Sequence, residues 1–518
     1  MAEDPASFDT SGEDAKTATI DRREMDRSFA KGVAWSALSR LSAQALTWIV
    51  TIAVAHILTK SDYGLVASVM IVIGMLRMVT EFGLGSAIVA HGKLTDSQVA
   101  QLGGFALILG LAAFVLTCGM ALVAGSLIQS SHARSILPVL GLSAALATLN
   151  SLPTALLQRR LEFRALSNLE AIRAILASVL VLGLALAGFG FWSLVLNDLV
   201  ASVVFTALLY WRTRYTLAMP TIEGIRPAFR LSSEVVISRV AFYFYANADL
   251  AAVSLRGGTV AAGEYSMAWT LTSLPNEKIN SILLSVAPGV FARVRDNDAE
   301  LSRYFLLLIE MFALFLFPAT IGLALVAPEF VSVILGEKWT PIIPIIRVLS
   351  LFLAVRCLIP TATTLLISRL RSRAVMNFAL GCLAVLPAGF YFAARWGGVA
   401  VAWVWVVLYP LIAYAIFKTT CDEINLPMRR LFGVLLKPLT SVVVMSAAVM
   451  LVRSAIGDWL PVVRLVVLSL VGALSFAGSV LFLMRERAVG LLKAARGLRA
   501  GKPLVADESL AVATDASH

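Results

Sequence analysis

Charged side chains are scarce in this chain. Asp, Glu, Lys and Arg together make up 14% of the 518 residues, whereas an ordinary soluble domain carries about 25%. Hydrophobic residues make up 59%, and the mean hydropathy is +0.85. This balance excludes a soluble globular protein of ordinary composition and predicts an all-α polytopic membrane protein.

Metal-binding and nucleotide-binding signatures are also lacking. The four cysteines show no CxxC spacing and lie mostly inside apolar segments, which disfavours a disulfide framework or a zinc site. The four histidines show no metal-ligand spacing. The sequence contains no GxxxxGKS or GxxxxGKT loop, so ATP hydrolysis by that route is excluded.

The composition also argues against an enzyme and against a nucleic-acid partner. The links predicted on the outer side of the membrane are short, and none carries a pair of carboxylates in an acid and base arrangement. We therefore predict no catalytic residue, no metal and no cofactor. The net charge of +11 comes from basic residues scattered between apolar segments and not from one patch, so it indicates membrane topology and not nucleic-acid binding.

What the chain does contain is a series of long apolar segments. Residues 33–89 form the first pair, joined by the short polar link TKSDYG, and each segment exceeds the roughly 20 residues that a helix needs to cross a bilayer. The pattern predicts about 14 crossings. Those after the first pair are expected at 105–128, 136–157, 166–187, 190–210, 231–255, 265–290, 304–327, 342–368, 374–394, 399–417, 431–452 and 462–484.

The spacing of these segments predicts a six plus six plus two organisation. We expect a disordered cytoplasmic tail at 1–30, an N-terminal six-helix bundle at 31–210, a cytoplasmic linker at 211–230, a C-terminal six-helix bundle at 231–417, two additional helices at 431–484, and a basic then disordered cytoplasmic tail at 485–518. Lys and Arg concentrate in the tails and the even-numbered links, which favours both termini in the cytoplasm.

The first hairpin is echoed about 200 residues later. Setting Arg239 over Arg40 brings the turn that ends in Gly-Glu-Tyr against the turn that contains Asp-Tyr-Gly, with a gap of about three residues. This predicts an internal duplication. Both copies enter from the same side of the membrane, so the two bundles should be related by a pseudo-two-fold axis along the membrane normal.

Several charged residues fall inside predicted crossings, where a charge costs at least about 2.5–3.5 kcal/mol. Five basic residues would line a cleft between the two bundles with positive charge, namely Arg40, Arg77, Arg239, Lys278 and Arg356. Because arginine binds phosphate oxygens bidentately, a pyrophosphate suits such a cleft. Structural alternatives remain open: Arg77 can pair with Glu81 four residues on, and Arg40 and Arg239 can reach the inner headgroups.

Acidic residues and prolines in the crossings suggest a transport cycle. Glu81, Asp249 and Glu277 are candidates for coupling to a proton or sodium gradient, the alternative being counter-ions for nearby arginines. Pro275 is expected to break the crossing at 265–290, and Pro318, Pro360 and Pro387 are candidates to break others. Broken helices expose backbone polar groups at the sites of transporters.

Five stretches carry a resemblance to a known family. They are DYG at 62–64, EFGLGSAIV at 81–89, PTALLQRRLEF at 153–163, GEYSMAWTLTSLPNEKI at 263–279 and GEKWTPIIPIIRVLSL at 336–351. The chain resembles the polysaccharide transporters of the multidrug/oligosaccharidyl-lipid/polysaccharide flippase superfamily, especially the exopolysaccharide and O-antigen repeat-unit flippases. These motifs are turns and packing segments, so no individual binding residue is carried over.

The resemblance implies a location and a substrate. It implies two six-helix bundles around a central cavity, with two extra C-terminal helices in some members, in a bacterial inner membrane. It also implies flipping of an undecaprenyl-pyrophosphate-linked oligosaccharide to the outer leaflet. The partners would be this lipid-linked oligosaccharide and membrane lipids, with polysaccharide polymerase and export components as further candidates.

Other functions stay open at this point. Within the superfamily they are a peptidoglycan-precursor flippase and a multidrug flippase, and from another class a membrane sugar polymerase or ligase. A drug exporter should show a cleft lined by acidic and aromatic residues, whereas the deep charges here lean basic. An enzyme would need carboxylates or arginines in an outer loop.

Overall fold

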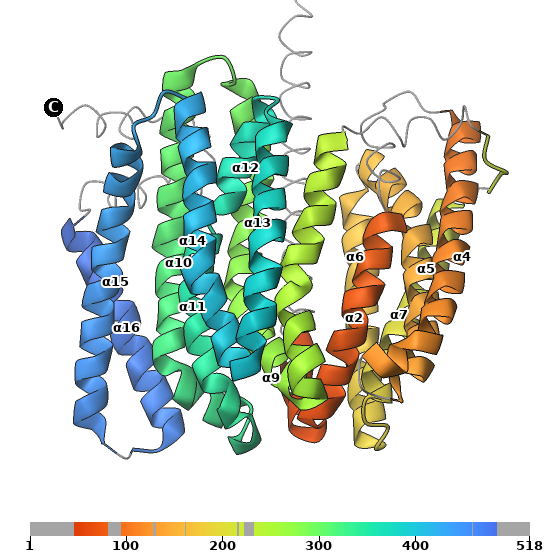
Figure 1. The fold of residues 1–518 in the computed structure, drawn as a ribbon, viewed down its shortest axis with the longest axis horizontal. Helices are drawn as coiled ribbons and strands as arrows, with labels where there is room; N and C mark the ends of the chain where they lie inside the picture. The colour runs from red at the N-terminus through yellow and green to blue at the C-terminus, as the bar shows by residue number, and fades with distance from the viewer. Residues whose placement is uncertain are drawn as a thin grey trace, which may run out of the picture. The chain divides into compact units, whose positions relative to one another are not determined.

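The computed structural model describes residues 46–80, 95–127, 131–160, 162–214, 217–221, 233–457 and 459–483. Regular structure within these ranges is helical throughout, with no strand (Figure 1). Eleven of the described helices are long and apolar enough to cross a membrane. The predicted all-α polytopic membrane class is therefore confirmed.

The chain divides into two compact units, which we describe separately. The first unit comprises Met1–Leu58, Leu76–Val123 and Arg134–Arg230, and the second comprises Thr59–Met75, Ala124–Ala133 and Leu231–His518. One division falls at the end of the predicted linker, yet the second unit also takes the first part of α2. The predicted arrangement of two six-helix bundles stays a prediction.

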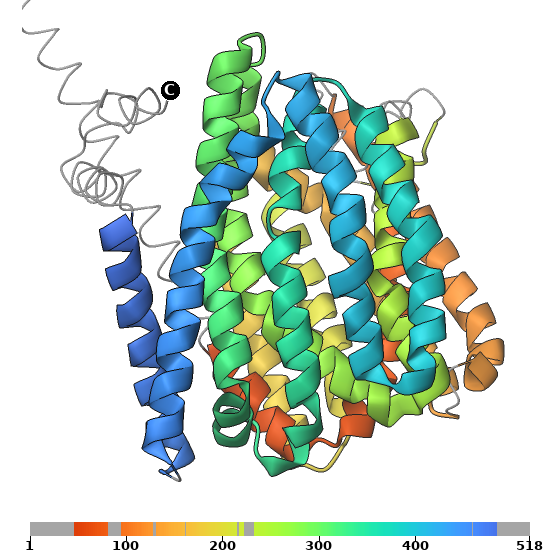
Figure 2. The ribbon, with the colours of Figure 1, turned by 60° about the vertical axis from the view of Figure 1, so that its left-hand side comes forward.

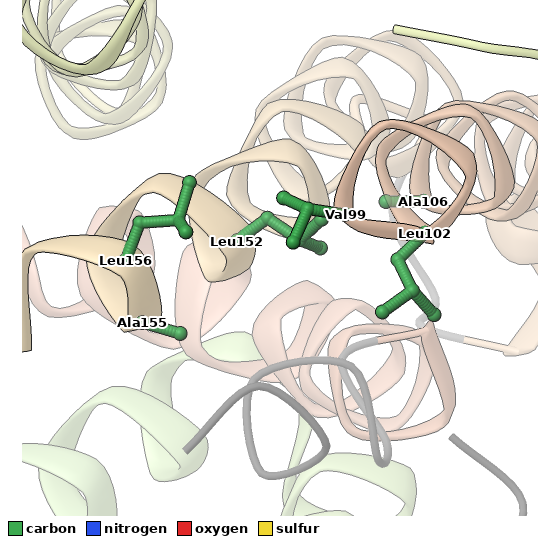
Figure 3. Close-up of a cluster of buried hydrophobic side chains, with 6 residues drawn as sticks. All are labelled: Val99, Leu102, Ala106, Leu152, Ala155 and Leu156. Carbon is green, nitrogen blue, oxygen red and sulfur yellow. The ribbon is translucent and has the colours of Figure 1, made fainter. Parts of the chain in front are cut away.

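The helices of the first unit follow the predicted crossings closely. They are the short apolar helix Leu46–Ile57, the end of α2 (Lys60–Thr80), and α4 (Asp96–Leu127), α5 (Ala133–Arg159), α6 (Phe163–Leu186) and α7 (Trp192–Thr213). Six buried residues form one core cluster between α4 and α5 (Figure 3): Val99, Leu102, Ala106, Leu152, Ala155 and Leu156. Helix α7 continues three residues into the segment predicted as linker.

The described part of the linker is attached to α4. The backbone N–H of Ala218 donates to the carbonyl oxygen of Ala100 over 3.0 Å, and the Thr221 hydroxyl donates to Oε1 of Gln101 over 2.6 Å. The approach depends on Gly104, since a Cβ atom there would lie 1.9 Å from the carbonyl oxygen of Ala218.

The second unit contains the remaining helices. They are α9 (Ser233–Arg293), α10 (Asp298–Ile334), η2 (Glu337–Ile342), α11 (Ile343–Arg356), α12 (Ile359–Ser368), α13 (Ser372–Ala393), η3 (Ala394–Trp396), α14 (Gly398–Glu423), α15 (Met428–Ile456) and α16 (Pro461–Leu483). The last two pack against each other and against α10 (Figure 2).

Helix α9 is a hairpin that holds two predicted crossings. Gly258 is the one position inside it with non-helical backbone, at φ 71° and ψ −170°. The Tyr265 hydroxyl nevertheless donates to Oδ2 of Asp249 over 2.9 Å. In a continuous straight helix these residues, 16 positions apart, would be separated by about 24 Å. The chain therefore turns back at Gly258, as the two predicted crossings at 231–255 and 265–290 require.

The start of α2 packs against this hairpin through two glycines in a reciprocal contact. A Cβ atom at Gly64 would lie 1.7 Å from the carbonyl oxygen of Thr259, and one at Gly263 would lie 1.8 Å from that of Lys60. Both pairs of equivalent positions are 199 residues apart, since 263 minus 64 and 259 minus 60 give the same offset. Such reciprocity is the mark of a two-fold axis between like segments. It supports the predicted internal duplication.

Polar side chains extend the same seam between α2 and α9. Lys60 Nζ lies 2.7 Å from Oε1 of Glu264, and the hydroxyls of Ser61 and Thr259 are 2.8 Å apart. A hydroxyl pair between Ser68 and Ser254 at 2.7 Å continues it. The contact between α2 and α9 thus consists of close-packed backbone flanked by side-chain hydrogen bonds.

Replacing Gly263 by alanine should destabilise the protein by about 1–3 kcal/mol, because the added methyl group collides with backbone that cannot move aside easily. Gly289→Ala, on the same helix, is the matched control, since a Cβ atom there meets nothing within 4 Å. Thermal unfolding of the two purified variants in detergent checks this. Equal melting temperatures would contradict the close contact.

The prediction that Pro275 breaks its crossing is wrong. Pro275 lies inside α9, and Pro318 and Pro387 lie inside α10 and α13. Pro275 removes one bond of the helical ladder, the bond to the carbonyl oxygen of Leu271, and the backbone of α9 keeps helical angles at every position except Gly258. Pro360 behaves differently: it lies in the first turn of α12, directly after the break that separates α12 from α11.

Candidate functional site

Arg77 of the first unit lies in a polar network that joins three helices. Its Nη2 atom donates to Oδ2 of Asp198 over 3.0 Å and to the Ser143 hydroxyl over 2.8 Å. Ser143 also hydrogen-bonds to Asp198, and its hydroxyl lies 3.1 Å from that of Ser202. The side chains of Arg77 and Asp198 are about one-quarter and one-fifth exposed, so they form a mostly buried ion pair.

This network changes the interpretation of Arg77. Asp198 is the counter-ion of Arg77. The positive charge that Arg77 was predicted to offer a pyrophosphate is therefore largely neutralised by this carboxylate. Glu81, which local spacing offered as the partner of Arg77, lies outside the described residues. The network explains how a charge is tolerated at this depth, because a mostly buried guanidinium needs a partner of opposite charge.

Asp249 of the second unit is buried, whereas Glu277, the other predicted coupling residue that the structure describes, is exposed. The residue exposure of Asp249 is 2%. Three donors surround the carboxylate: the indole Nε1 of Trp405 at 2.8 Å, the Tyr265 hydroxyl at 2.9 Å and the backbone N–H of Leu250 at 2.7 Å. These bonds satisfy both oxygens, and their donors come from α9 and α14.

Aromatic rings from four helices pack around this carboxylate. The ring of Trp405 stacks on Phe352 with centroids 4.5 Å apart and lies 4.8 Å from Phe390 and 5.6 Å from Tyr409. Trp269 lies 6.0 Å from Trp405. A carboxylate enclosed in this way is shielded from bulk water, which strengthens its interaction with any charge nearby.

Arg356 ends α11 at the break before α12. Its guanidinium lies over the rings of Trp269 and Phe352, 5.2 and 5.8 Å from their centroids, and both rings contact Trp405, the indole donor of Asp249. Arg356 is half-buried and forms no ion pair or hydrogen bond with any described residue. A guanidinium without a partner is costly in hydrocarbon, so the edge of Arg356 that no described residue binds suits water or a polar ligand.

The break beside Arg356 leaves other polar groups without partners. The buried hydroxyl of Ser350 in α11 and that of Thr361 in the first turn of α12 find no acceptor or donor within the described ranges. Interrupted helices in transporters carry their polar sites at such breaks. The break that Pro360 predicted therefore coincides with the unpaired arginine.

The remaining predicted site residues are spread more widely. Arg239 is exposed on α9, one turn before Tyr243, whose hydroxyl donates to the carbonyl oxygen of Ile71 over 2.5 Å. Glu277 is exposed on α9 as well, and Lys278 follows it in the same helix. Arg40 lies outside the described residues. Of the eight predicted site residues, two lie together in one cluster of described residues, namely Asp249 and Arg356.

Sequence reasoning missed the residues that hold this cluster together. Trp405 and Tyr265 are not among the predicted site residues, although each carries a donor that needs a partner when buried. Ser143, the hydroxyl between Arg77 and Asp198, gave no signal at all. A search for tryptophan and tyrosine in crossings that also hold a carboxylate would have found Tyr265 but not Trp405, because the crossing at 399–417 holds no carboxylate.

The described residues were compared with the ligand sets that hold metal ions. No group of three or more metal-ligating side chains occurs in the part of the chain that the structure describes. What the second unit offers is a cation that no described residue pairs, beside an enclosed carboxylate, inside a bundle of helices long and apolar enough to cross a membrane. These features are those of a polytopic membrane transporter.

Solved structures show the same fold. The chain is similar to the lipid II flippase MurJ in an inward closed conformation, with a TM-score of 0.70 at 14% identity over 88% of this chain and 100% of that one. It is also similar to an inward-facing multidrug resistance MATE family transporter of the MOP superfamily, with a TM-score of 0.61 at 17% identity over 75% of this chain and 98% of that one. The fold is therefore that of the MOP superfamily.

Sequence comparison identifies the family. The chain belongs to the polysaccharide biosynthesis protein family, whose model matches residues 53–344. It is 24% identical to the teichuronic acid biosynthesis protein TuaB of Bacillus subtilis strain 168, over 74% of this chain and 80% of that protein. It is 27% identical to the succinoglycan biosynthesis transport protein ExoT of Rhizobium meliloti strain 1021, over 65% and 67%. The predicted family is confirmed. One of these relatives is named as a transport protein, in agreement with the prediction that the chain is a transporter and not an enzyme.

Proposed function

We propose that this protein flips undecaprenyl-pyrophosphate-linked oligosaccharide repeat units from the inner to the outer leaflet of a bacterial inner membrane. The product would supply exopolysaccharide or O-antigen synthesis. The observation that carries the proposal is Arg356, a guanidinium that no described residue pairs, beside a helix break in a chain of the polysaccharide biosynthesis protein family. Arginine can hold a pyrophosphate by two parallel hydrogen bonds while the lipid tail stays in the hydrocarbon.

Related proteins support the substrate class. ExoT is named as a transport protein of succinoglycan biosynthesis, and WzxC of Escherichia coli K12, 24% identical over 61% of this chain and 65% of that protein, as a lipopolysaccharide biosynthesis protein. The polysaccharide polymerase and export components remain proposed partners. The lipid II flippase shares the fold only, at 14% identity.

A multidrug function is less well supported by the site. Asp249 lies beside the aromatic side chains of Trp405 and Tyr265, and sites that bind organic cations commonly combine aromatic rings with a negative charge. Its carboxylate is 98% buried and accepts three hydrogen bonds, however. A cationic drug would have to displace these donors before it could pair with the acid.

The direct test is transport in proteoliposomes. Fluorescent undecaprenyl-pyrophosphate oligosaccharide, lipid II and a cationic dye are supplied separately, and the label that reaches the far leaflet is quenched by an impermeant reductant. We expect movement of the first substrate. Faster movement of lipid II or of the dye would replace this function by the corresponding alternative.

We further propose that Asp249 couples transport to a proton or sodium gradient. An enclosed carboxylate close to the unpaired Arg356 can exchange a bound cation for the substrate's negative charge. Asp249→Asn should remove the response of flipping to an imposed gradient, whereas Glu277→Gln, at an exposed position, should retain it. Gradient-independent flipping by the unmodified protein would refute the coupling.

Both termini are proposed to be cytoplasmic. The support is the excess of Lys and Arg in the tails and even-numbered links. A cysteine at Thr221 should then be protected from an impermeant thiol reagent in intact cells, and one at Val260, at the α9 bend, should react. The opposite labelling pattern would invert the topology.

A further inference from the structure

Two exposed arginines stack on neighbouring aromatic rings at one end of the second unit. The guanidinium carbon of Arg256 lies 4.3 Å from the ring centroid of Tyr391, and that of Arg395 lies 5.6 Å from the centroid of Phe392. The two rings contact each other at 6.2 Å. We call these four residues the arginine–aromatic cluster.

The cluster lies where helices end. Arg256 directly precedes the bend of α9 at Gly258, and Arg395 lies in η3, between the end of α13 and Gly397. Trp396, the next residue, is 76% exposed. Tryptophan and arginine at the ends of crossing helices occupy the level of the lipid headgroups.

Neither arginine has an acidic partner among the described residues. Other basic residues near helix ends of this unit do: Lys60 pairs with Glu264, and Arg453 and Arg464 both pair with Glu329. The N–H donors of Arg256 and Arg395 make no hydrogen bond to any described residue. Stacking on a ring holds the guanidinium plane in place and leaves its N–H edge free for a bidentate acceptor.

We propose that the arginine–aromatic cluster binds the phosphate group of an anionic phospholipid. A phosphate supplies the bidentate acceptor that the arginines lack. The acyl chains would lie along the exposed apolar side chains beside it, such as Leu255 and Phe392, which are 45% and 57% exposed. With the orientation proposed above, this lipid belongs to the outer leaflet. The site goes beyond the proposed transport function and does not depend on it.

The apolar rim favours a lipid over free phosphate. A soluble anion would gain nothing from the exposed tryptophan and leucine, whereas a phospholipid contacts both parts at once. The negative charge matters as well, since a zwitterionic headgroup offers its own ammonium group to the phosphate. We therefore expect phosphatidylglycerol to bind more tightly than phosphatidylcholine.

Native mass spectrometry of the full-length protein in detergent tests the proposal. Phosphatidylglycerol and phosphatidylcholine are titrated separately, and the fraction of protein that carries lipid is measured. The double variant Arg256→Gln, Arg395→Gln should bind phosphatidylglycerol at least about tenfold more weakly, while its binding of phosphatidylcholine changes little. The control Arg293→Gln, Arg295→Gln removes two exposed arginines at the other end of α9 that stack on no described ring.

A second pair of variants isolates the rings. Tyr391→Leu keeps both charges but removes the platform of Arg256 and should weaken phosphatidylglycerol binding by a smaller factor. Tyr414→Leu, at an exposed tyrosine of α14 without a stacked arginine, should not. The proposal is overturned if the control double variant loses as much binding as the cluster variant. It is also overturned if inorganic phosphate alone displaces the lipid at equal concentration, which would assign the site to a free anion.

Discussion

Arg356→Ala is expected to slow flipping of a pyrophosphate-linked oligosaccharide by roughly 10- to 100-fold, because a charge-assisted hydrogen bond contributes about 1.5–3 kcal/mol. The residue makes no ion pair or hydrogen bond with a described residue, and Asp249 beside it keeps its three hydrogen-bond donors when the arginine is removed. The protein should therefore fold normally while it fails to capture substrate. Initial flipping rates in proteoliposomes of matched protein content measure the effect.

Arg356→Lys tests whether this residue holds pyrophosphate by two parallel hydrogen bonds or supplies positive charge alone. Lysine keeps the charge but cannot form two parallel hydrogen bonds in one plane, so an intermediate rate is expected if the residue holds pyrophosphate. The control is Arg303→Ala at the start of α10, an exposed arginine that also lies over an aromatic ring, 5.9 Å from Tyr304. Normal flipping by Arg356→Ala would remove this residue from the substrate path and leave its contact with Trp269 as its role.

Glu329→Ala is expected to lower the free energy of unfolding by about 3–5 kcal/mol, the usual cost of removing one partner from a buried ion pair. Glu329 of α10 is 4% exposed, and one oxygen receives both Arg453 of α15 at 2.9 Å and Arg464 of α16 at 3.1 Å. Arg453 also donates to the carbonyl oxygen of Leu325 over 3.0 Å. Without the carboxylate, two guanidiniums would lie together without a counter-charge.

The three residues fasten the last two helices to α10. They gather near the ends of these helices, and Figure 1 shows the α10–α11 and α15–α16 links at the same end of this unit. Thermal unfolding of Glu329→Ala should show a lower midpoint, while Glu337→Ala, at an exposed carboxylate a few residues further on, should match the unmodified protein. Arg453→Ala should cost less than Glu329→Ala, since Arg464 still neutralises the acid. Equal midpoints for all variants would mean that apolar packing alone holds α15 and α16.

The reciprocal contact of Gly64 and Gly263 also bears on how the site is distributed. With the offset of 199 residues, the position equivalent to Asp249 is Val50, which is buried. The two segments at this offset therefore share their packing glycines but not their carboxylate. A transporter built this way would carry the Asp249 site in one repeat only.

The order and approximate bounds of the membrane helices followed from the sequence alone. Hydrophobicity and length are local properties, and a crossing needs about 20 apolar residues wherever the rest of the chain lies. The resemblance that identified the family depended likewise on short local motifs. The turn near residue 258 and the break at Pro360 were also readable, because glycine and proline act on the backbone where they stand.

The partners of the buried charges were decided only by the tertiary structure. Local spacing paired Arg77 with Glu81, yet the folded chain brings Asp198 to it from 121 residues away. Asp249 receives its indole donor from 156 residues away. A helix presents a charge to whichever neighbours its packing selects, and that selection depends on side-chain shape across several helices at once. For this reason the sequence could name Asp249 and Arg356 as candidates, but only the fold could show that they lie in one cluster and that Arg77 lies in another.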